Sequence, residues 1–158
     1  MEPEARAATR RDLDELVRLY RGLEFEQTEL RPLWRLADGL PEPIEEAFEG
    51  ILASGDPLLW VGSLDDVVVG FLWATIDPLL PQAGGRRVGT IRLIYVEPDA
   101  RGVGVGEAMM RAAMTELRGR GLRLFDAKVS PGHRAAKNFF ESHGFSARLI
   151  VMHHDDLR

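Results

Sequence analysis

The first third of the chain has mostly helical periodicity. Apolar residues recur every three or four positions over residues 13–23, which predicts an amphipathic helix with Asp12 as its N-cap. The pattern over residues 24–40 fits neither helix nor strand clearly. After the proline-containing break at residues 41–43, helical spacing returns over residues 44–52. We therefore expect two helices before the first long strand.

Strand periodicity dominates the middle of the chain. Runs rich in β-branched and aromatic residues occupy 58–63 and 67–76, and the short polar stretch between them predicts an antiparallel hairpin. The remaining strands are expected at 5–9, 88–96, 122–129 and 144–152, and the remaining helices at 104–118 and 133–143. This order predicts a mixed α+β fold that forms one domain over residues 1–158, with a βαβ unit late in the chain.

Composition excludes several classes of protein. Hydrophobic residues make up 45% of the 158 positions and charged residues 28%, which suits a packed globular core. No run of about 18 uncharged apolar residues is present, and the first residues are too polar for a signal peptide. The absence of cysteine excludes disulfide scaffolds and thiolate chemistry. We expect a cytoplasmic protein without membrane contact.

Charge is unevenly distributed along the sequence. The first 56 residues carry a net charge of -7 and the remainder +2, which together give the overall -5. Such a distribution suits an anionic ligand at one end and a cationic one at the other, although solvated acidic helix faces would explain it equally well. An acidic chain without a basic stripe is not expected to bind nucleic acid.

A glycine-rich segment between a predicted strand and a predicted helix carries the clearest chemical signal. Glycines at positions 102, 104 and 106 allow a tight turn whose N–H groups point into one concavity at the positive end of the helix. Arg101 can add a charged contact to the same anion. Glu107 stands where a P-loop needs Lys and where a dinucleotide fingerprint needs Gly, so neither fits well. Alternatively, these glycines serve only the turn between the strand and the helix and bind no ligand.

Three motifs follow one another along the second half of the chain. Arg101, Gly104 and Gly106 form an Arg-x-x-Gly-x-Gly signature. An apolar strand ending in Val-x-Pro precedes it, and a helix with Ala, an aromatic residue and then Gly-Phe follows it. These flanking residues are Val96, Pro98, Ala136, Phe140, Gly144 and Phe145. In these motifs, and in the order of elements over nearly the whole chain, the sequence resembles the GCN5-related N-acetyltransferases (GNAT family).

The resemblance implies a GNAT-like fold: a mostly antiparallel sheet, splayed between its fourth and fifth strands and flanked by about four helices, with acetyl-CoA in the gap. It also implies that pantetheine runs along residues 94–96 and that the pyrophosphate lies on the amides of residues 102–106. The cofactor-binding residues would be Ile94, Tyr95, Val96, Arg101, Gly102, Val103, Gly104, Val105, Gly106, His133, Ala136 and Phe140.

The family's reaction implies direct attack of an amine on the thioester, without a metal, and the catalytic groups here depart from the usual pattern. Phe140 occupies the position at which many members have a tyrosine that protonates the leaving thiolate. Either another donor serves, with Tyr95 as the candidate acid, or the thiolate leaves unaided or through water, or the protein is a poor catalyst. Glu97 and His133 are candidates for the base, and His133 stands where many members have an asparagine.

Residues between the first two helices contact the substrate in similar proteins, which points to Glu24, Phe25 and Glu26. Arg92, on the long strand predicted at residues 88–96, favours a substrate that carries a carboxylate. We expect an N-acetyltransferase that acts on a primary amine of a small molecule, with a homodimer paired through the last strands. The alternatives are transfer to a protein N-terminus or lysine, and a catalytically weak acetyl-CoA-binding sensor or scaffold.

Overall fold

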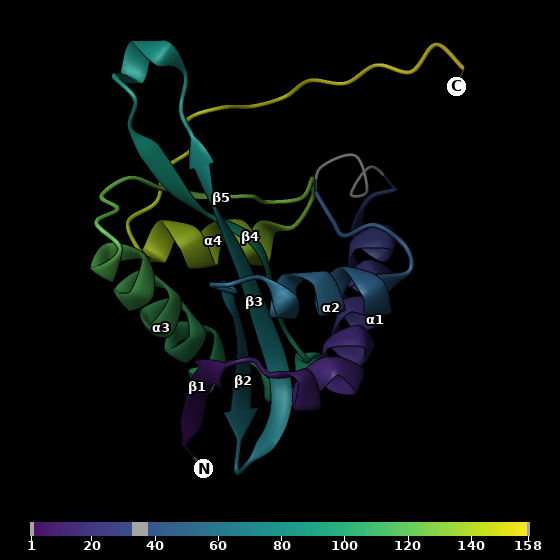
Figure 1. The fold of residues 1–158 in the computed structure, drawn as a ribbon. Helices are drawn as coiled ribbons and strands as arrows, with labels where there is room; N and C mark the ends of the chain where they lie inside the picture. The colour runs from purple at the N-terminus through teal and green to yellow at the C-terminus, as the bar shows by residue number, and fades with distance from the viewer. Residues whose placement is uncertain (1, 33–37, 158) are drawn as a thin grey trace.

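The computed structural model describes residues 2–32 and 38–157, and a five-stranded sheet lies at its centre (Figure 1). The strands lie side by side in chain order. The first four are antiparallel, and the fifth is parallel to the fourth. The strands are β1 (Pro3–Ala7), β2 (Leu59–Leu64), β3 (Val67–Pro78), β4 (Arg87–Val96) and β5 (Phe125–Ala127). The predicted mixed, mostly antiparallel sheet is confirmed.

The predicted hairpin forms between β2 and β3. Asp65 and Asp66 connect the strands with φ angles of 49° and 67°. Two consecutive residues with positive φ make a type I′ turn, whose twist matches that of the flanking strands. Asp tolerates this conformation better than most residues, because its short polar side chain hydrogen-bonds locally.

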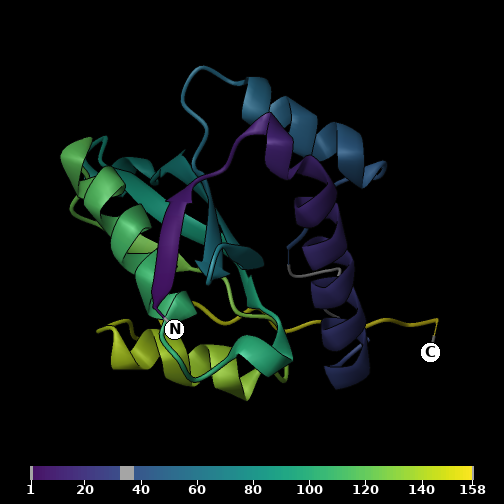
Figure 2. The same ribbon diagram turned by 90° about the horizontal axis from the view of Figure 1, so that it is seen from below.

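Helices cover both faces of the sheet, with α1 and α2 on one side and α3 and α4 on the other (Figure 2). None of the helices within the described ranges is long and apolar enough to cross a membrane. The helices are α1 (Leu13–Leu30), α2 (Ile44–Ala53), α3 (Val105–Gly119) and α4 (Arg134–Ser142). Single 3₁₀ turns occupy Arg10–Asp12, Pro81–Ala83 and Pro98–Ala100.

Each face of the sheet has its own apolar core. Leu16, Leu23 and Phe48 are buried between α1, α2 and the sheet. Met109 and Leu117 of α3 are buried on the opposite face. Full burial of a side chain of this size stabilises the fold by about 1.5–3 kcal/mol. The two cores fix the helices on either side of β4, and so position the site described below.

The first helix is longer than its apolar pattern predicts. It continues through residues 24–30, which the pattern left unassigned, while residues 33–37 lie outside the described part of the chain. Asp12 is not its side-chain cap. The Asp12 carboxylate instead accepts two hydrogen bonds of 2.8 Å from the Arg6 guanidinium and one from the Thr9 amide. It therefore ties β1 to the start of α1.

The sheet opens between β4 and β5. β5 pairs only with Gly89, Thr90 and Ile91, and the Lys128 amide adds one last hydrogen bond to the Ile91 carbonyl. Beyond that point, residues 92–96 of β4 have no strand partner on this side within the described ranges. The predicted splay is confirmed, and it leaves main-chain N–H and C=O groups of β4 available to a ligand.

β5 is shorter than the predicted strand at 122–129. Leu122 is buried against α3, and its amide donates to the Leu117 carbonyl, so this residue closes the helix and does not start the strand. The strand begins three residues later, at Phe125.

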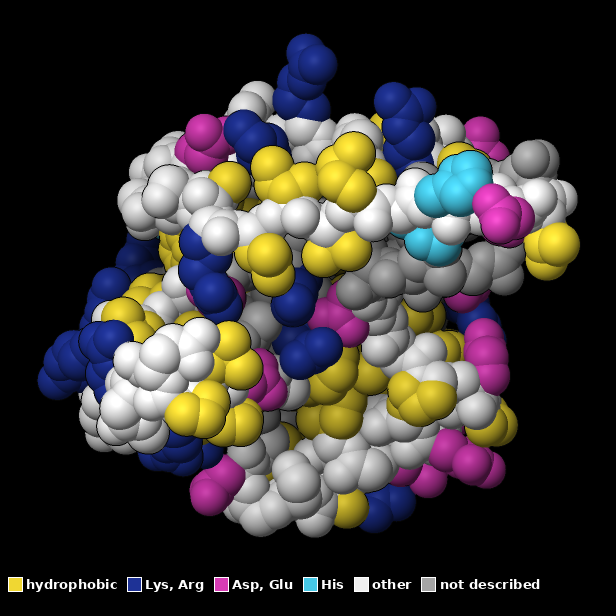
Figure 3. All heavy atoms as spheres, turned by 90° about the horizontal axis from the view of Figure 1, so that it is seen from above, with side chains coloured by type: hydrophobic (Ala, Val, Ile, Leu, Met, Phe, Trp, Pro, Cys, Tyr) yellow, Lys and Arg dark blue, Asp and Glu magenta, His cyan; other side chains and the backbone are white. Residues whose placement is uncertain are grey.

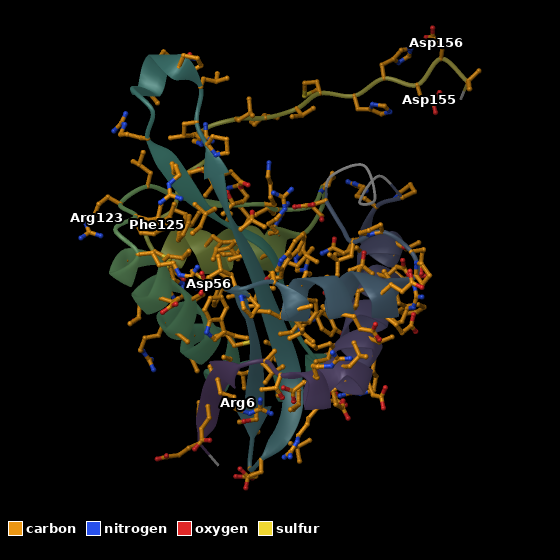
Figure 4. All side chains as sticks on the ribbon, viewed as in Figure 1. Arg6, Asp56, Arg123, Phe125, Asp155 and Asp156 are labelled. Atoms are coloured by element: carbon orange, nitrogen blue, oxygen red, sulfur yellow. The ribbon has the colours of Figure 1, made fainter. Side chains whose placement is uncertain are left out.

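The prediction of a final strand at 144–152 is wrong. The Phe145 amide donates to the Phe140 carbonyl at the end of α4, and Arg148 pairs with Asp126. The following four residues, 149–152, are 71–87% exposed and run away from the body. Figure 3, the view from above, shows apolar and then histidine side chains across this surface of the molecule. Asp155 and Asp156 lie near the C-terminal end of the tail (Figure 4). No described strand pairs with this tail, so no ladder forms.

Candidate active site

The glycine-rich turn ends in the N-terminus of α3. Gly102 has a φ of 82°, and Gly104, the N-cap of α3, has a φ of 99°. These backbone conformations are strained for residues with a Cβ. The amides of the first helical turn have no carbonyl partner within the helix and lie at the positive end of its dipole. The segment therefore presents donors to an anion, as the spacing predicted.

A groove of about 200 Å³ runs from this turn along the open edge of β4 to the start of α4. Ten of the twelve residues predicted to bind the cofactor line it. Of the other two, Val103 is exposed and Phe140 lines a smaller cavity nearby. The groove is lined by Glu26, Ile94, Tyr95, Val96, Ala100, Arg101, Gly102, Gly104, Val105, Gly106, Glu107, His133, Ala135, Ala136 and Phe139.

The shape and chemistry of the groove fit coenzyme A. A Cβ at Gly106 would come within 3.2 Å of the Phe139 ring, so the bare backbone keeps the groove open at this point. The α3 amides suit a pyrophosphate. The unpaired edge of β4 suits an extended arm that carries amide groups, because such an arm can form hydrogen bonds like an added strand.

Arg101 is held by protein partners. Its Nε donates to the Val96 carbonyl at 2.7 Å, and its Nη2 donates to Glu26 Oε1 at 2.7 Å. The guanidinium also lies 5.5 Å from the centre of the Tyr95 ring. In this arrangement Arg101 joins the end of β4 to α1, and it does not extend freely toward the phosphate site.

His133 caps α4 and faces Glu26. Its Nδ1 accepts a hydrogen bond from the Ala136 amide at 3.1 Å, so the neutral ring carries its proton on Nε2. That nitrogen lies 3.3 Å from Glu26 Oε2, although the angle is not that of a hydrogen bond. Neither nitrogen offers a free lone pair to an amine. This geometry supports a capping and positioning role and disfavours the predicted role as a base.

The hydroxyl of Tyr95 and the carboxylate of Glu97 both face α1. A Cβ on Gly22 would come within 2.7 Å of the Tyr95 hydroxyl, so the hydroxyl packs against α1. Burial is the main cause that raises the pKa of Tyr95. Glu97 forms an ion pair with Arg18 and does not line the groove. These contacts disfavour the predicted roles of Tyr95 as the acid and of Glu97 as the base.

Of the three candidate substrate residues on α1, the structure brings only Glu26 into the groove. Glu24 pairs with Arg21 at 3.2 Å on the outer side of the helix. The Phe25 side chain is 69% exposed. Successive residues of a helix point in different directions, so consecutive positions cannot all face one site.

Arg92 lies between two carboxylates. Its Nε is 3.0 Å from Asp38 Oδ2, and its Nη1 is 3.7 Å from Asp77 Oδ2. The guanidinium also stacks 5.6 Å from the centre of the Trp73 ring. Because two acidic side chains already face this one cation, the cluster disfavours the predicted recognition of a substrate carboxylate by Arg92.

A second, smaller cavity of about 20 Å³ lies beside the groove, and the two share Ile94, His133 and Ala136. The remaining lining residues are Leu23, Gln27, Arg92, Leu93, Lys128, Val129, Ser130 and Phe140. The sequence patterns did not predict Gln27 here, or Ala100, Glu107, Ala135 and Phe139 in the groove. Helical spacing from Ala135 and Ala136 could have indicated Phe139.

Comparison with known proteins agrees with this geometry. The model of the acetyltransferase (GNAT) family matches residues 13–145. A mycothiol acetyltransferase of Saccharomonospora viridis is 38% identical over 79 residues, which are 49% of this chain and 26% of the relative. The chain spans less than half the length of the curated mycothiol acetyltransferases that it matches.

Solved structures share the fold over nearly the whole chain. A transcriptional regulator from Bacillus halodurans has a TM-score of 0.75 and 26% identity, with 97% of this chain and 100% of that one covered. The aminoglycoside N-acetyltransferase AAC(6')-Iy, solved in complex with CoA, has a TM-score of 0.71 and 22% identity, with 98% and 95% covered. Given the family match over most of its length and this shared fold, the chain belongs to the acetyltransferase (GNAT) family.

Proposed function

We propose that the protein transfers the acetyl group of acetyl-CoA to a primary amine of a small molecule. The observation that carries this proposal is the groove, which joins the amide-rich start of α3 to the open edge of β4. A diphosphate at the α3 amides would direct an extended arm along residues 92–96. The arm would then end near Ile94, His133 and Ala136, where the groove meets the smaller cavity.

The reaction forms an N–C bond, breaks the thioester C–S bond and moves one proton in net from the amine to sulfur. Acetyl-CoA supplies the activated acetyl group when it is bound. The chain's own contribution is to hold the two reactants in line and to exclude water, which lowers the entropic part of the barrier. Glu26 and Arg101 form an ion pair at the groove wall, which holds α1 against the end of β4.

The charges around the smaller cavity balance. Arg92 and Lys128 line the cavity, and Asp38 and Asp77 face Arg92, so two positive and two negative charges leave no net charge. The amine acceptor is therefore proposed from the groove and the family match, and not from this charge.

A second candidate, a coenzyme A-binding module with little activity, is favoured by one observation. Phe140 fills the position of the usual tyrosine and is only 3% exposed, while the Tyr95 hydroxyl packs against α1. An enzyme without a placed acid depends on another donor for the leaving sulfur.

The test combines calorimetric titration with acetyl-CoA and a thiol-release assay. The panel contains glucosamine, neamine, putrescine and a peptide with N-terminal alanine, and acetyl-CoA without amine measures hydrolysis. Binding with thiol release on a small amine supports the proposal. Release on the peptide alone indicates a protein acetyltransferase, and binding without release indicates the binding module. Absence of binding overturns the cofactor assignment.

A further inference from the structure

Gln27 is a polar residue on the buried face of α1. Leu16, Leu19 and Leu23 form the apolar face of this helix, and Gln27 continues it four residues after Leu23. The residue is 5% exposed, and its Oε1 has no hydrogen-bond partner in the described part of the chain. An unpartnered buried acceptor costs free energy that an apolar residue of the same size would not.

This side chain lines the smaller cavity at the end of the groove. The cavity has a volume of about 20 Å³, enough for one water-sized group such as an amine nitrogen. Its shared residues Ile94, His133 and Ala136 place it at the end of the groove opposite the glycine turn. The acetyl end of an extended arm would reach this point.

No donor that lines the cavity within the described ranges hydrogen-bonds to Gln27 Oε1. Arg92 faces Asp38, and the proton-bearing nitrogen of His133 faces Glu26. Lys128 and Ser130 also line the cavity, and neither donates to this oxygen. An oxygen acceptor needs an N–H or O–H group, and an acetyl thioester has neither at its reacting end. An amine brings N–H donors and one lone pair.

We propose that Gln27 Oε1 accepts a hydrogen bond from the acceptor amine and positions its lone pair toward the acetyl carbon. The inference rests on the proposed function and names the positioning residue of that same site. The narrow cavity adds a selectivity: an unsubstituted amine fits, whereas an N-methyl group needs space that the walls do not leave.

The test compares Gln27→Met, which keeps the length of the side chain but removes the acceptor, with Gln27→Glu, which keeps an acceptor oxygen. Glu29→Gln, at an exposed position of the same helix, is the matched control. Steady-state thiol release is measured with the best amine of the panel and with its N-methyl derivative. Calorimetry with acetyl-CoA and thermal melts accompany these assays.

We expect Gln27→Met to raise the KM for the amine about tenfold, the worth of one hydrogen bond of this kind. Acetyl-CoA affinity should stay within about twofold and the thermal midpoint should not fall, because Oε1 has no hydrogen-bond partner to lose among the described residues. Gln27→Glu should keep most of the amine affinity, and the wild type should disfavour the N-methyl amine.

One result would overturn the inference alone: an active wild type whose amine KM is unchanged in Gln27→Met. A lower thermal midpoint in that same variant would show that Gln27 has a structural role. A wild type that binds acetyl-CoA but acetylates no amine would overturn the proposed function, and the inference with it.

Discussion

Gly104→Ala separates the role of the glycine turn in ligand binding from its role in folding. Gly104 has a φ of 99° at the start of α3, and Gly121 has a φ of 87° just past the end of the same helix. Only Gly104 borders the groove. Gly121→Ala is therefore a matched control that carries the same kind of backbone cost without touching the site.

The expected cost to stability is similar for the two variants. An L-residue in the left-handed region costs about 1–2 kcal/mol. For a chain of this length, that lowers the thermal midpoint by about 2–8 °C. A Cβ at Gly104 also comes within 3.2 Å of the Pro3 ring, while one at Gly121 meets nothing within 4 Å. Gly104→Ala should thus lie at the upper end of the range.

The expected effect on binding differs. A shift of the turn at residue 104 misaligns amides that would hold the pyrophosphate, and a hydrogen bond to a charged group is worth about 1.5–3 kcal/mol. Loss of one such bond weakens acetyl-CoA binding about 10- to 150-fold. Gly121→Ala should bind within about twofold of wild type.

Calorimetric Kd values for acetyl-CoA, with thermal melts by circular dichroism, give both quantities for each variant. Equal Kd values in Gly104→Ala and Gly121→Ala would refute the assignment of the α3 amides as the anion site. The same conclusion would follow if both variants lost affinity only in proportion to their loss of stability.

Three further results are expected. His133→Asn should keep the α4 cap and the pH profile of thiol release, because the capping nitrogen of His133 is not free to act as a base; loss of the profile's neutral limb would contradict this. The Arg6 hydrogen bonds are the main cause that lowers the pKa of Asp12, so their stabilisation is complete above the ordinary Asp value near 4 and is lost as pH falls through the lower folded pKa. Melts from pH 7 to pH 2 should accordingly show a smaller acid loss for Asp12→Asn than for wild type, and equal losses would count against the pair. Gly22→Ala should lower the thermal midpoint, and Tyr95→Phe in the same background should partly restore it by removing the crowded hydroxyl; no restoration would mean that the clash is relieved elsewhere.

Local sequence signals determined much of the fold and of the cofactor groove. Gly102, Gly104, Asp65 and Asp66 have positive φ angles. Gly and Asp tolerate this conformation better than most residues, so these turns can be predicted from the residue types alone. The groove residues also follow one another closely, since most of them lie between Ile94 and Glu107. Patterns of this kind need no knowledge of distant neighbours.

The catalytic assignments depend on tertiary contacts that the sequence does not show. Arg101 and His133 both meet Glu26, a residue 75 positions before the first and 107 before the second. The engagement of Glu97 by Arg18 is equally distant in sequence, and no local pattern reports it. The final strand was overpredicted for a related reason, because an apolar run becomes a strand only where another strand pairs with it.

Gln27 is a polar residue on an apolar helix face, and this pattern in the sequence could have indicated a functional position. A polar residue that interrupts an apolar helical face either has a buried partner or serves a ligand. The choice between these depends on the cavity beside it, which the sequence does not display.

The most direct test of the account is mass spectrometry of the amine after incubation with acetyl-CoA and the wild-type protein, with thiol release followed in the same sample. The account predicts an acetylated amine in an amount equal to the thiol released above the amine-free control. Thiol release without acetylated amine would show that the groove supports hydrolysis, and it would contradict transfer to an amine as the function of this site.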